Sequence, residues 1–257
     1  MANIINLDRL PERVKGLIVP YISGLIEIYA ASLKSIMIYG SAAQREDFVP
    51  GHSNINLLVI LNEITLLDLK KGAKLVSMGK RQKKIIPLFL TLQHINTSSD
   101  VFPIEFMEMK ENHVVIYGDE IFDSIVIHSE NVRLQCESTL KGQIIKLRQG
   151  YLELMAKPEL LKRLMIDSLT GLMPTIRNIL RVKGMVAIAI KKDEVINQLK
   201  EAYGIDTAPL LTVLHSKLRM GKLANGIVES VFEQYLDVIQ CLAIAVDELK
   251  LGNKGLQ

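Results

Sequence analysis

The sequence has few cysteines, little net charge and no long uninterrupted apolar segment. Its two cysteines, Cys136 and Cys241, lie far apart without metal-ligand spacing, which indicates reduced thiols and implies neither a metal site nor a disulfide. The formal net charge is only +3, which argues against a chain that binds polyanions over its whole surface. The longest apolar stretch, residues 16–30, contains Pro20 and Glu27 and is shorter than the roughly 20 residues that a membrane span requires.

The N-terminus also lacks a targeting signal, because it has no basic segment followed by an apolar run. We therefore expect a cytoplasmic protein that does not associate with membranes. The chain has 257 residues, of which 49% are hydrophobic and 23% are charged. This is the composition of a folded globular protein, long enough for one large domain or two smaller ones.

Strand-like and helix-like segments alternate in the first half of the sequence. Short, continuous apolar runs at residues 35–39 and 55–61 are typical of strands buried on both faces. A helix is expected from a cap at Asp8 to about Leu33, and another over residues 64–80. Three further strands are expected at residues 85–92, 103–109 and 125–128, with a short helix or turn around residues 97–100.

From residue 129 onward the pattern is helical. Gly184, Gly204 and Gly221 each follow a periodic segment, where a left-handed helix cap is usual. The change in pattern predicts an α+β protein with two domains: a mixed β-sheet with helices in residues 1–128, then an all-α helical bundle in residues 129–257. We expect about five helices in the bundle, at residues 129–155, 160–183, 193–203, 208–219 and 227–249.

The most informative segment joins two of the predicted strands. The first strand ends in Gly40 and Ser41, and the second opens with Ser53, Asn54 and, two residues later, Asn56. Because side chains alternate along a strand, the two asparagines project from the same face. A Gly-Ser turn lets the backbone approach a triphosphate closely and offers amide and hydroxyl donors. These residues gather polar groups at one end of the predicted sheet.

This layout resembles the active-site hairpin of nucleotidyltransferases of the DNA polymerase β superfamily. In those enzymes the second strand opens with Asp-x-Asp, whose carboxylates bind metal ions for phosphoryl transfer. The resemblance implies that Asn54 and Asn56 occupy the two carboxylate positions. It also implies that Gly40, Ser41 and Ser53 bind the nucleotide.

In the same family a later strand of the sheet supplies a third acid. Glu105, in the strand predicted at residues 103–109, matches that position, whereas Glu108 is offset to the opposite face. The resemblance is specific over residues 33–120. The helical remainder is similar only in layout to the bundles of antibiotic-modifying nucleotidyltransferases and to the helical partners of nucleotidyltransferase toxin–antitoxin systems.

Amides in place of carboxylates change the chemistry that the resemblance implies. An asparagine oxygen can contact a cation but carries no charge, so Mg²⁺ affinity is expected to fall by orders of magnitude, with Glu105 left as the charged metal ligand. Neither Asn54 nor Asn56 can act as a general base. We therefore expect an inactive or weakened nucleotidyltransferase fold that binds a nucleoside triphosphate or serves in regulation, with Mg²⁺ held weakly or not at all.

Two alternatives stay open. One is an active metal-dependent enzyme that transfers a nucleoside monophosphate to a small molecule, protein or RNA. The other is a non-catalytic interaction protein of the antitoxin type. The leucine, isoleucine and methionine content of the helical half also makes a homodimer through the bundle a candidate assembly.

A basic cluster occupies the middle of the first half. It contains seven of the thirteen Lys and Arg residues in positions 1–128. The ordinary interpretation of such a cluster is the solvated face of a helix. The alternative is a patch for a triphosphate or RNA near the site. Nucleic acid is not an expected partner, because no aromatic residue lies among these positions to stack on bases. The cluster comprises Lys70, Lys71, Lys74, Lys80, Arg81, Lys83 and Lys84.

Overall fold

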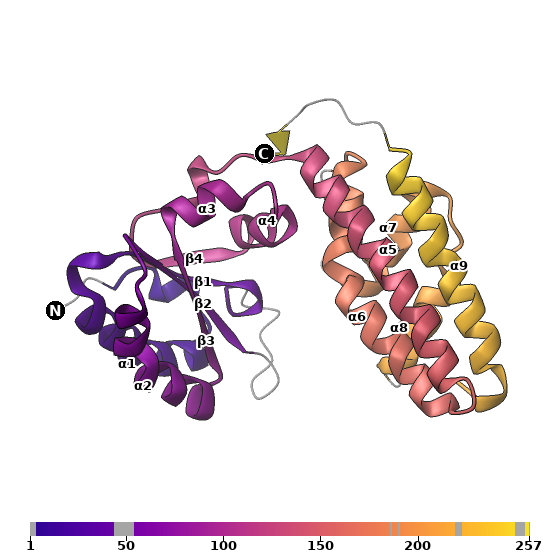
Figure 1. The fold of residues 1–257 in the computed structure, drawn as a ribbon, viewed down its shortest axis with the longest axis horizontal. Helices are drawn as coiled ribbons and strands as arrows, with labels where there is room; N and C mark the ends of the chain where they lie inside the picture. The colour runs from indigo at the N-terminus through magenta and orange to yellow at the C-terminus, as the bar shows by residue number, and fades with distance from the viewer. Residues whose placement is uncertain are drawn as a thin grey trace. The chain divides into compact units, whose positions relative to one another are not determined.

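The computed structural model describes residues 4–43, 54–185, 187–189, 191–218, 223–249 and 255–256. The chain divides into two compact units, Met1–Val126 and Ile127–Gln257. The first holds a β-sheet with helices and the second holds a helical bundle (Figure 1). The predicted α+β class, a sheet followed by helices, is confirmed.

The first unit is built on a four-stranded mixed sheet. Its strands are β1 (Leu33–Tyr39), β2 (Ile55–Leu61), β3 (Ile85–Thr91) and β4 (His113–Gly118), in the order β3-β2-β1-β4. Strand β1 runs antiparallel to both β2 and β4, whereas β2 and β3 are parallel. The predicted strand at residues 55–61 is confirmed at both ends, and those near residues 35–39 and 85–92 are confirmed within two residues.

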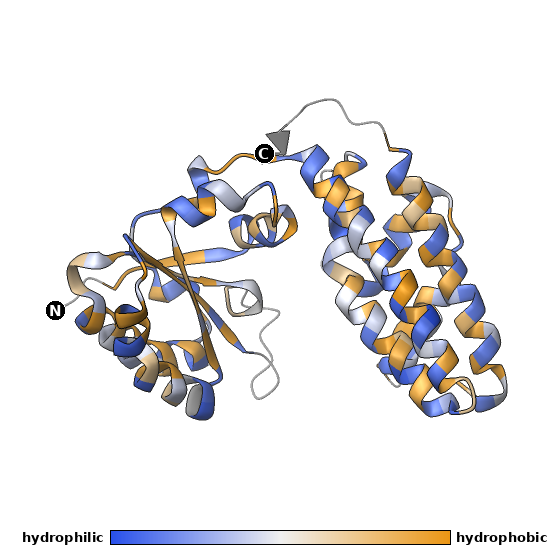
Figure 2. Cartoon of the chain, in the orientation of Figure 1, coloured by the Kyte–Doolittle hydropathy of each residue, from blue (hydrophilic) through white to orange (hydrophobic). Residues whose placement is uncertain are grey.

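The sheet strands are continuously apolar because both faces are covered. Ile38, Leu57 and Val59 belong to a core cluster that includes helix α1 (Glu12–Tyr29). The alternate side chains, Met37 and Leu58 among them, point to the other face and are also fully buried. Helices α3 (Leu92–Ser98) and α4 (Pro103–Glu111) lie on that second side of the sheet (Figure 1). Figure 2 shows that the strands are mostly hydrophobic, whereas the helices carry both hydrophobic and hydrophilic residues.

Helix α2 (Leu66–Met78) follows β2 and begins at a capping box. The Thr65 hydroxyl accepts a hydrogen bond from the Asp68 backbone N–H, and the Asp68 carboxylate accepts one from the Thr65 N–H at 3.0 Å. The helix continues into a π-helical turn, Gly79–Lys83, which leads directly into β3.

Helix α1 and the turn after it, Glu12–Ser32, are long and apolar enough to cross a membrane by length and composition alone. In the fold, Val14, Ile18 and Leu25 of this helix are fully buried in the core cluster of the sheet. This is the arrangement of a core helix in a globular domain, so the segment is weak evidence for a span. The apolar stretch runs longer than expected because Pro20 lies inside α1 without ending it.

Among its described residues, the second unit contains five helices of ten residues or more. Helix α5 (Ser129–Leu154) packs against α6 (Pro158–Val182) and α9 (Val228–Asp247), and α7 (Lys192–Tyr203) and α8 (Ala208–Lys217) pack against α6. A short pair of strands, β5 (Ile127–His128) and β6 (Gly255–Leu256), completes the unit. The five predicted helices are confirmed within two residues at the described ends. Left-handed caps are confirmed at Gly184 and Gly204, and Gly221 lies outside the described residues.

Three sequence predictions in the first half of the chain were wrong. Residues 103–109 form helix α4 and not a strand, because Pro103 occupies the first helical turn and the apolar spacing of so short a segment fits either period. Residues 127–128 pair with β6 and do not close the main sheet, whose fourth strand is β4. The first helix begins at Glu12 after Pro11, and residues 7–9 form only a 3₁₀ turn.

Candidate functional site

One end of the four-stranded sheet gathers the polar residues singled out in the sequence. Strand β1 ends there at Tyr39, and β2, β3 and β4 begin there, because β1 is antiparallel to β2 and β4 while β3 is parallel to β2. Gly40 directly follows β1, Asn54 directly precedes β2, and Asn56 is the second residue of β2. We call this end of the sheet the polar edge.

Strand register places a row of side chains on one face of the polar edge. Asn56 is the partner of Tyr39 on β1 and of Ile86 on β3, and Tyr39 is the partner of His113 on β4. Paired residues share a face, and this face is opposite to the one that buries Ile55 in the core. Asn56 is half-buried, Asn54 is exposed, and Ile86 is 42% exposed. The row is therefore reachable from solvent.

Gly40 is required by the local backbone. Its φ of +71° lies in the left-handed region, and its N–H donates to the carbonyl oxygen of Asn112 at 2.9 Å. A Cβ at this position would lie 3.3 Å from Nδ2 of Asn56, so glycine also leaves room for that amide. Ser41 lies in the 3₁₀ turn Gly40–Ala42. The structure thus brings Gly40, Ser41, Asn54 and Asn56 to one edge.

The described residues of the polar edge do not form a donor set that fits a divalent cation. The four strands of the sheet contain no Asp or Glu, so neither β3 nor β4 supplies the third acid that the resemblance requires. Among the residues that the structure describes, no group of three or more His, Cys, Asp or Glu side chains could hold a metal ion. Two neutral amides are poor ligands for Mg²⁺, which prefers charged oxygen.

One predicted site residue is placed differently from the expectation, and one is not described. Glu105 lies exposed in the first turn of α4, and not on a strand beside β2. Its assignment to the third acid position came from the incorrect strand prediction for residues 103–109. Ser53 lies outside the described residues.

Sequence reasoning missed three side chains near this edge. The His113 ring lies with Nε2 2.8 Å from Oε2 of Glu120 and Nδ1 3.0 Å from the carbonyl oxygen of Lys110. The other oxygen of Glu120 accepts the Phe122 N–H at 2.9 Å, so this carboxylate is held on the β4 side, away from β2. Burial raises the pKa of Tyr39, which keeps its hydroxyl protonated. These side chains would have been found if β4 and its pairing with β1 had been predicted.

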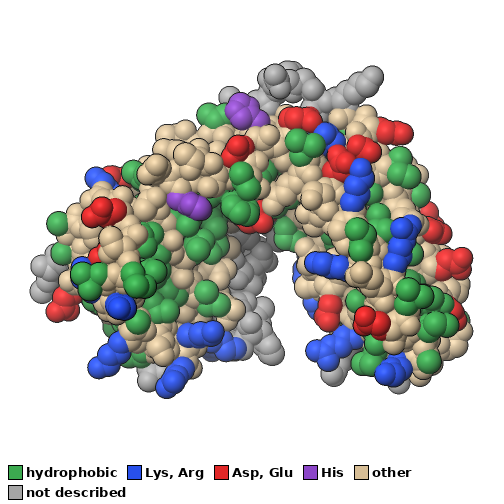
Figure 3. Space-filling model, in the orientation of Figure 1, with side chains coloured by type: hydrophobic (Ala, Val, Ile, Leu, Met, Phe, Trp, Pro, Cys, Tyr) green, Lys and Arg blue, Asp and Glu red, His purple; other side chains and the backbone are tan. Residues whose placement is uncertain are grey.

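The basic cluster reaches the polar edge at one end. Ile55, the first residue of β2, donates its N–H to the carbonyl oxygen of Lys84 at 2.9 Å, so Lys84 stands beside Asn54. Lys80, Arg81 and Lys84 are exposed. Figure 3 shows Lys and Arg side chains gathering along the lower end of this unit.

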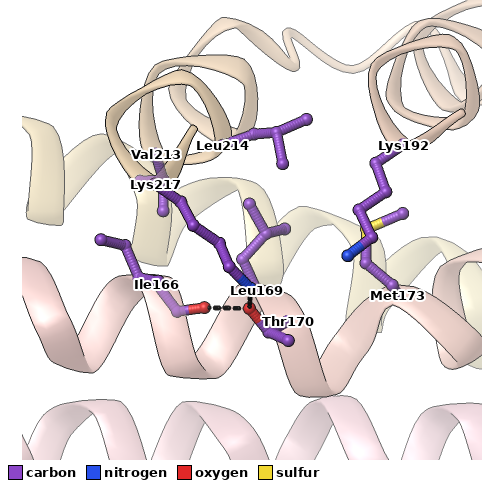
Figure 4. Close-up of a pocket in the computed structure, with 8 residues that line it drawn as sticks. All are labelled: Ile166, Leu169, Thr170, Met173, Lys192, Val213, Leu214 and Lys217. Carbon is purple, nitrogen blue, oxygen red and sulfur yellow. Dashed lines mark hydrogen bonds between the residues drawn. The ribbon is translucent and has the colours of Figure 1, made fainter. Parts of the chain in front are cut away.

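A small pocket in the helical unit lies between α6, α7 and α8 (Figure 4). Its cavity volume of about 10 Å³ is no more than one water molecule needs, far below that of a ligand site. Lys217 crosses it and donates to the Thr170 hydroxyl at 2.8 Å. The pocket is lined by Ile166, Leu169, Thr170, Met173, Lys192, Val213, Leu214 and Lys217.

The mixed four-stranded sheet followed by a helical bundle is a fold that the chain shares with a solved protein. Among solved structures the chain is similar to the spectinomycin adenyltransferase AAD(9) from Enterococcus faecialis, crystallised with ATP and spectinomycin. The match has a TM-score of 0.53 and 14% sequence identity, and it covers 86% of this chain and 98% of that one. An identity this low establishes the fold alone. The sequence matches no known family profile and no curated protein.

Proposed function

We propose that the protein is a nucleotidyltransferase fold that binds a nucleoside triphosphate at the polar edge and has lost most or all nucleotidyl transfer. The observation that carries this proposal is the charge of the edge. The sequence resemblance implies that Asn54 and Asn56 replace two carboxylates, and β3 and β4 contain no Asp or Glu. We propose a regulatory role, because such a protein would bind the nucleotide without turning it over. We also propose that the protein is cytoplasmic.

Nucleotidyl transfer is lost in this proposal because it requires two things that the described residues of the polar edge do not supply. Metal ions must be held so that they neutralise the charge of the transferred group, and this needs converging carboxylates. The attacking hydroxyl must also lose a proton to a base, which an amide cannot accept. Binding makes smaller demands, because a glycine turn, two amides and nearby cations can all contact phosphate oxygens.

The solved neighbour supports nucleotide binding as the function most compatible with this fold, since it was crystallised with ATP. For this chain we propose ATP or a related triphosphate as the ligand. A homodimer through the bundle remains a prediction. Leu152 and Ile145 of α5, which are 75% and 57% exposed, are its candidate contacts.

Two measurements test the proposal together. The first is calorimetric titration with ATP, which should show saturable binding weakened by Asn56→Leu, a change that removes the amide but keeps the size. The second is release of pyrophosphate from ATP with Mg²⁺ or Mn²⁺, in the presence of spectinomycin, RNA or the protein itself as acceptor. We expect none above background. Release of pyrophosphate that is abolished by Asn54→Ala would establish the alternative, an active enzyme with unusual ligands. Absence of nucleotide binding would favour a protein-interaction role.

A further inference from the structure

The segment that leads into the polar edge has charge of one sign. Residues 69–99 contain no Asp or Glu, yet they contain the seven Lys and Arg residues of the basic cluster. The whole chain has a net charge of +3, so the remainder of the molecule is net negative. A local excess of this size makes a positive potential where the cluster is exposed.

The fold directs the last part of this segment to the polar edge. The π-helical turn Gly79–Lys83 is fixed at its start, because a Cβ on Gly79 would lie 2.5 Å from the Tyr21 ring of α1. It is fixed at its end by the hydrogen bond from Ile55 N–H to the carbonyl oxygen of Lys84. Lys84 itself has a φ of +50°, an uncommon backbone conformation for a lysine. Lys84 is therefore held next to Asn54, and Lys80 and Arg81 lie on the turn that directly precedes it.

This arrangement inverts the electrostatics of a two-metal site. In such a site, carboxylates hold cations and the cations hold the triphosphate. At the polar edge, amides replace the carboxylates, and side-chain cations lie next to the amides. A metal-free triphosphate carries more negative charge than its magnesium complex, so it is the better complement to lysine and arginine.

We propose that the polar edge binds the triphosphate directly through Lys80, Arg81 and Lys84, with no divalent cation, and that Mg²⁺ weakens this binding by competing for the phosphates. The proposal rests on the nucleotide binding proposed above and specifies how the charge is met. Asn54, Asn56 and the Gly40 turn then supply hydrogen bonds rather than metal ligands.

The experiment is calorimetric titration of the full chain with ATP, once in EDTA and once with excess Mg²⁺. We expect the Kd to rise about threefold or more on adding Mg²⁺, and inorganic tripolyphosphate to compete with ATP in EDTA. The edge variant Lys80→Gln/Lys84→Asn should raise the Kd in EDTA about tenfold or more, because two charge-assisted contacts are lost. Asparagine is chosen at position 84 because it tolerates the positive φ.

The matched control is Lys70→Gln/Lys74→Gln, which removes the same charge from exposed lysines of α2 within the same acid-free segment. We expect it to change the Kd less than about threefold, an effect of diffuse charge alone. Circular dichroism checks that both variants keep the wild-type helix content, and a Lys84→Asn single variant replaces the double one if it does not fold.

Each outcome separates the two proposals. Binding that requires Mg²⁺, or is strengthened by it, overturns the metal-free inference while leaving nucleotide binding intact. An equal loss in the edge and control variants overturns the assignment to Lys80 and Lys84. Absence of ATP binding in both buffers overturns the inference and the proposed function together.

Discussion

The two units of the molecule use charge in different ways. In the helical unit Arg133 is buried and lies between two carboxylates, with Glu130 at 2.8 Å and Glu137 at 2.8 Å, and it also donates to the carbonyl oxygen of Val246 at 3.3 Å. In the sheet unit residues 69–99 contain seven cations and no carboxylate, and the last part of this run, up to Lys84, leads to the polar edge. The two ion pairs of Arg133 lie within α5 and its hydrogen bond to Val246 joins α5 to α9, whereas an exposed excess of one sign suits an external anion. If the proposed triphosphate binding is correct, the same residue types serve structure in one unit and binding in the other.

The largest effect that we expect comes from removing Arg133, whose contacts serve structure in the helical unit. Arg133→Ala should lower the free energy of unfolding by about 2 kcal/mol, because it leaves Glu137 and the Val246 carbonyl without their buried partner. Urea denaturation followed by circular dichroism measures this. Arg163→Ala is the control, since the pair Arg163–Asp167 is 3.7 Å apart and its side chains are 79% and 70% exposed. It should lower the free energy by about 0.5 kcal/mol or less. Equal losses would contradict a structural role specific to Arg133.

A second change sharpens the binding half by restoring the missing acids. Asn54→Asp/Asn56→Asp should strengthen binding of Mn²⁺ or Mg²⁺ about tenfold or more. A tenfold gain corresponds to about 1.4 kcal/mol of binding free energy. Coulomb's law assigns ~4 kcal/mol to two unit charges about 4 Å apart at a protein surface, so the expected gain is well within this range. Calorimetric titration with the metal measures this gain.

The control for this change is Asn62→Asp/Asn96→Asp, which adds the same charge at two exposed positions outside the polar edge. It should leave metal affinity unchanged within about twofold. If the edge variant binds metal no better than the control, residues 54 and 56 do not form a latent metal site.

A third change concerns the start of α2, which carries the basic cluster. Thr65→Ala should lower the free energy of unfolding by about 1 kcal/mol, because the capping box is lost. Thr65→Ser, which keeps the hydroxyl, should restore most of it. Thermal unfolding of the three proteins gives the comparison, and an unchanged midpoint for Thr65→Ala would contradict a stabilising cap.

The same cap predicts a pH dependence. Hydrogen bonds from Thr65, and then from Lys71, lower the pKa of Asp68 to about 2, below its unfolded value of about 3.9. A group with a lowered folded pKa stabilises the protein above its unfolded pKa, and this contribution is lost as the pH falls toward 2. The stability difference between wild type and Asp68→Asn should therefore be largest near neutral pH and shrink between about pH 4 and pH 2. A difference that is constant over this range would contradict the assignment.

The smallest expected effect concerns Glu105. Because it lies exposed at the start of α4 and not on the sheet, Glu105→Gln should change ATP affinity, with or without Mg²⁺, by less than about twofold. Calorimetric titration in both buffers is the measurement. A metal-dependent loss of binding in this variant would restore Glu105 to the role that the sequence suggested.

Much of the fold could be predicted because its signals are local. Strand β2 is a continuous apolar run, and its predicted limits, residues 55–61, match the structure. Helices α5 to α9 have apolar periods and terminal Pro or Gly residues that mark their ends. Residues 103–111 have no such clear period, since Ile104, Phe106, Met107 and Met109 are all buried and satisfy both a helical and a strand pattern. Because of this single ambiguity, Glu105 was assigned to a strand and β4 was not predicted.

The sequence by itself determined the chemistry available to this protein. Two amides at the start of a buried strand, a Gly-Ser turn before it and a run of cations without acids are all readable in the printed residues. Only the tertiary structure decided which of these meet. Register across β3, β2, β1 and β4 brings Gly40, Asn56 and Lys84 to one edge and leaves Glu105 on a helix, because strand pairing depends on backbone hydrogen bonds between segments far apart in the chain.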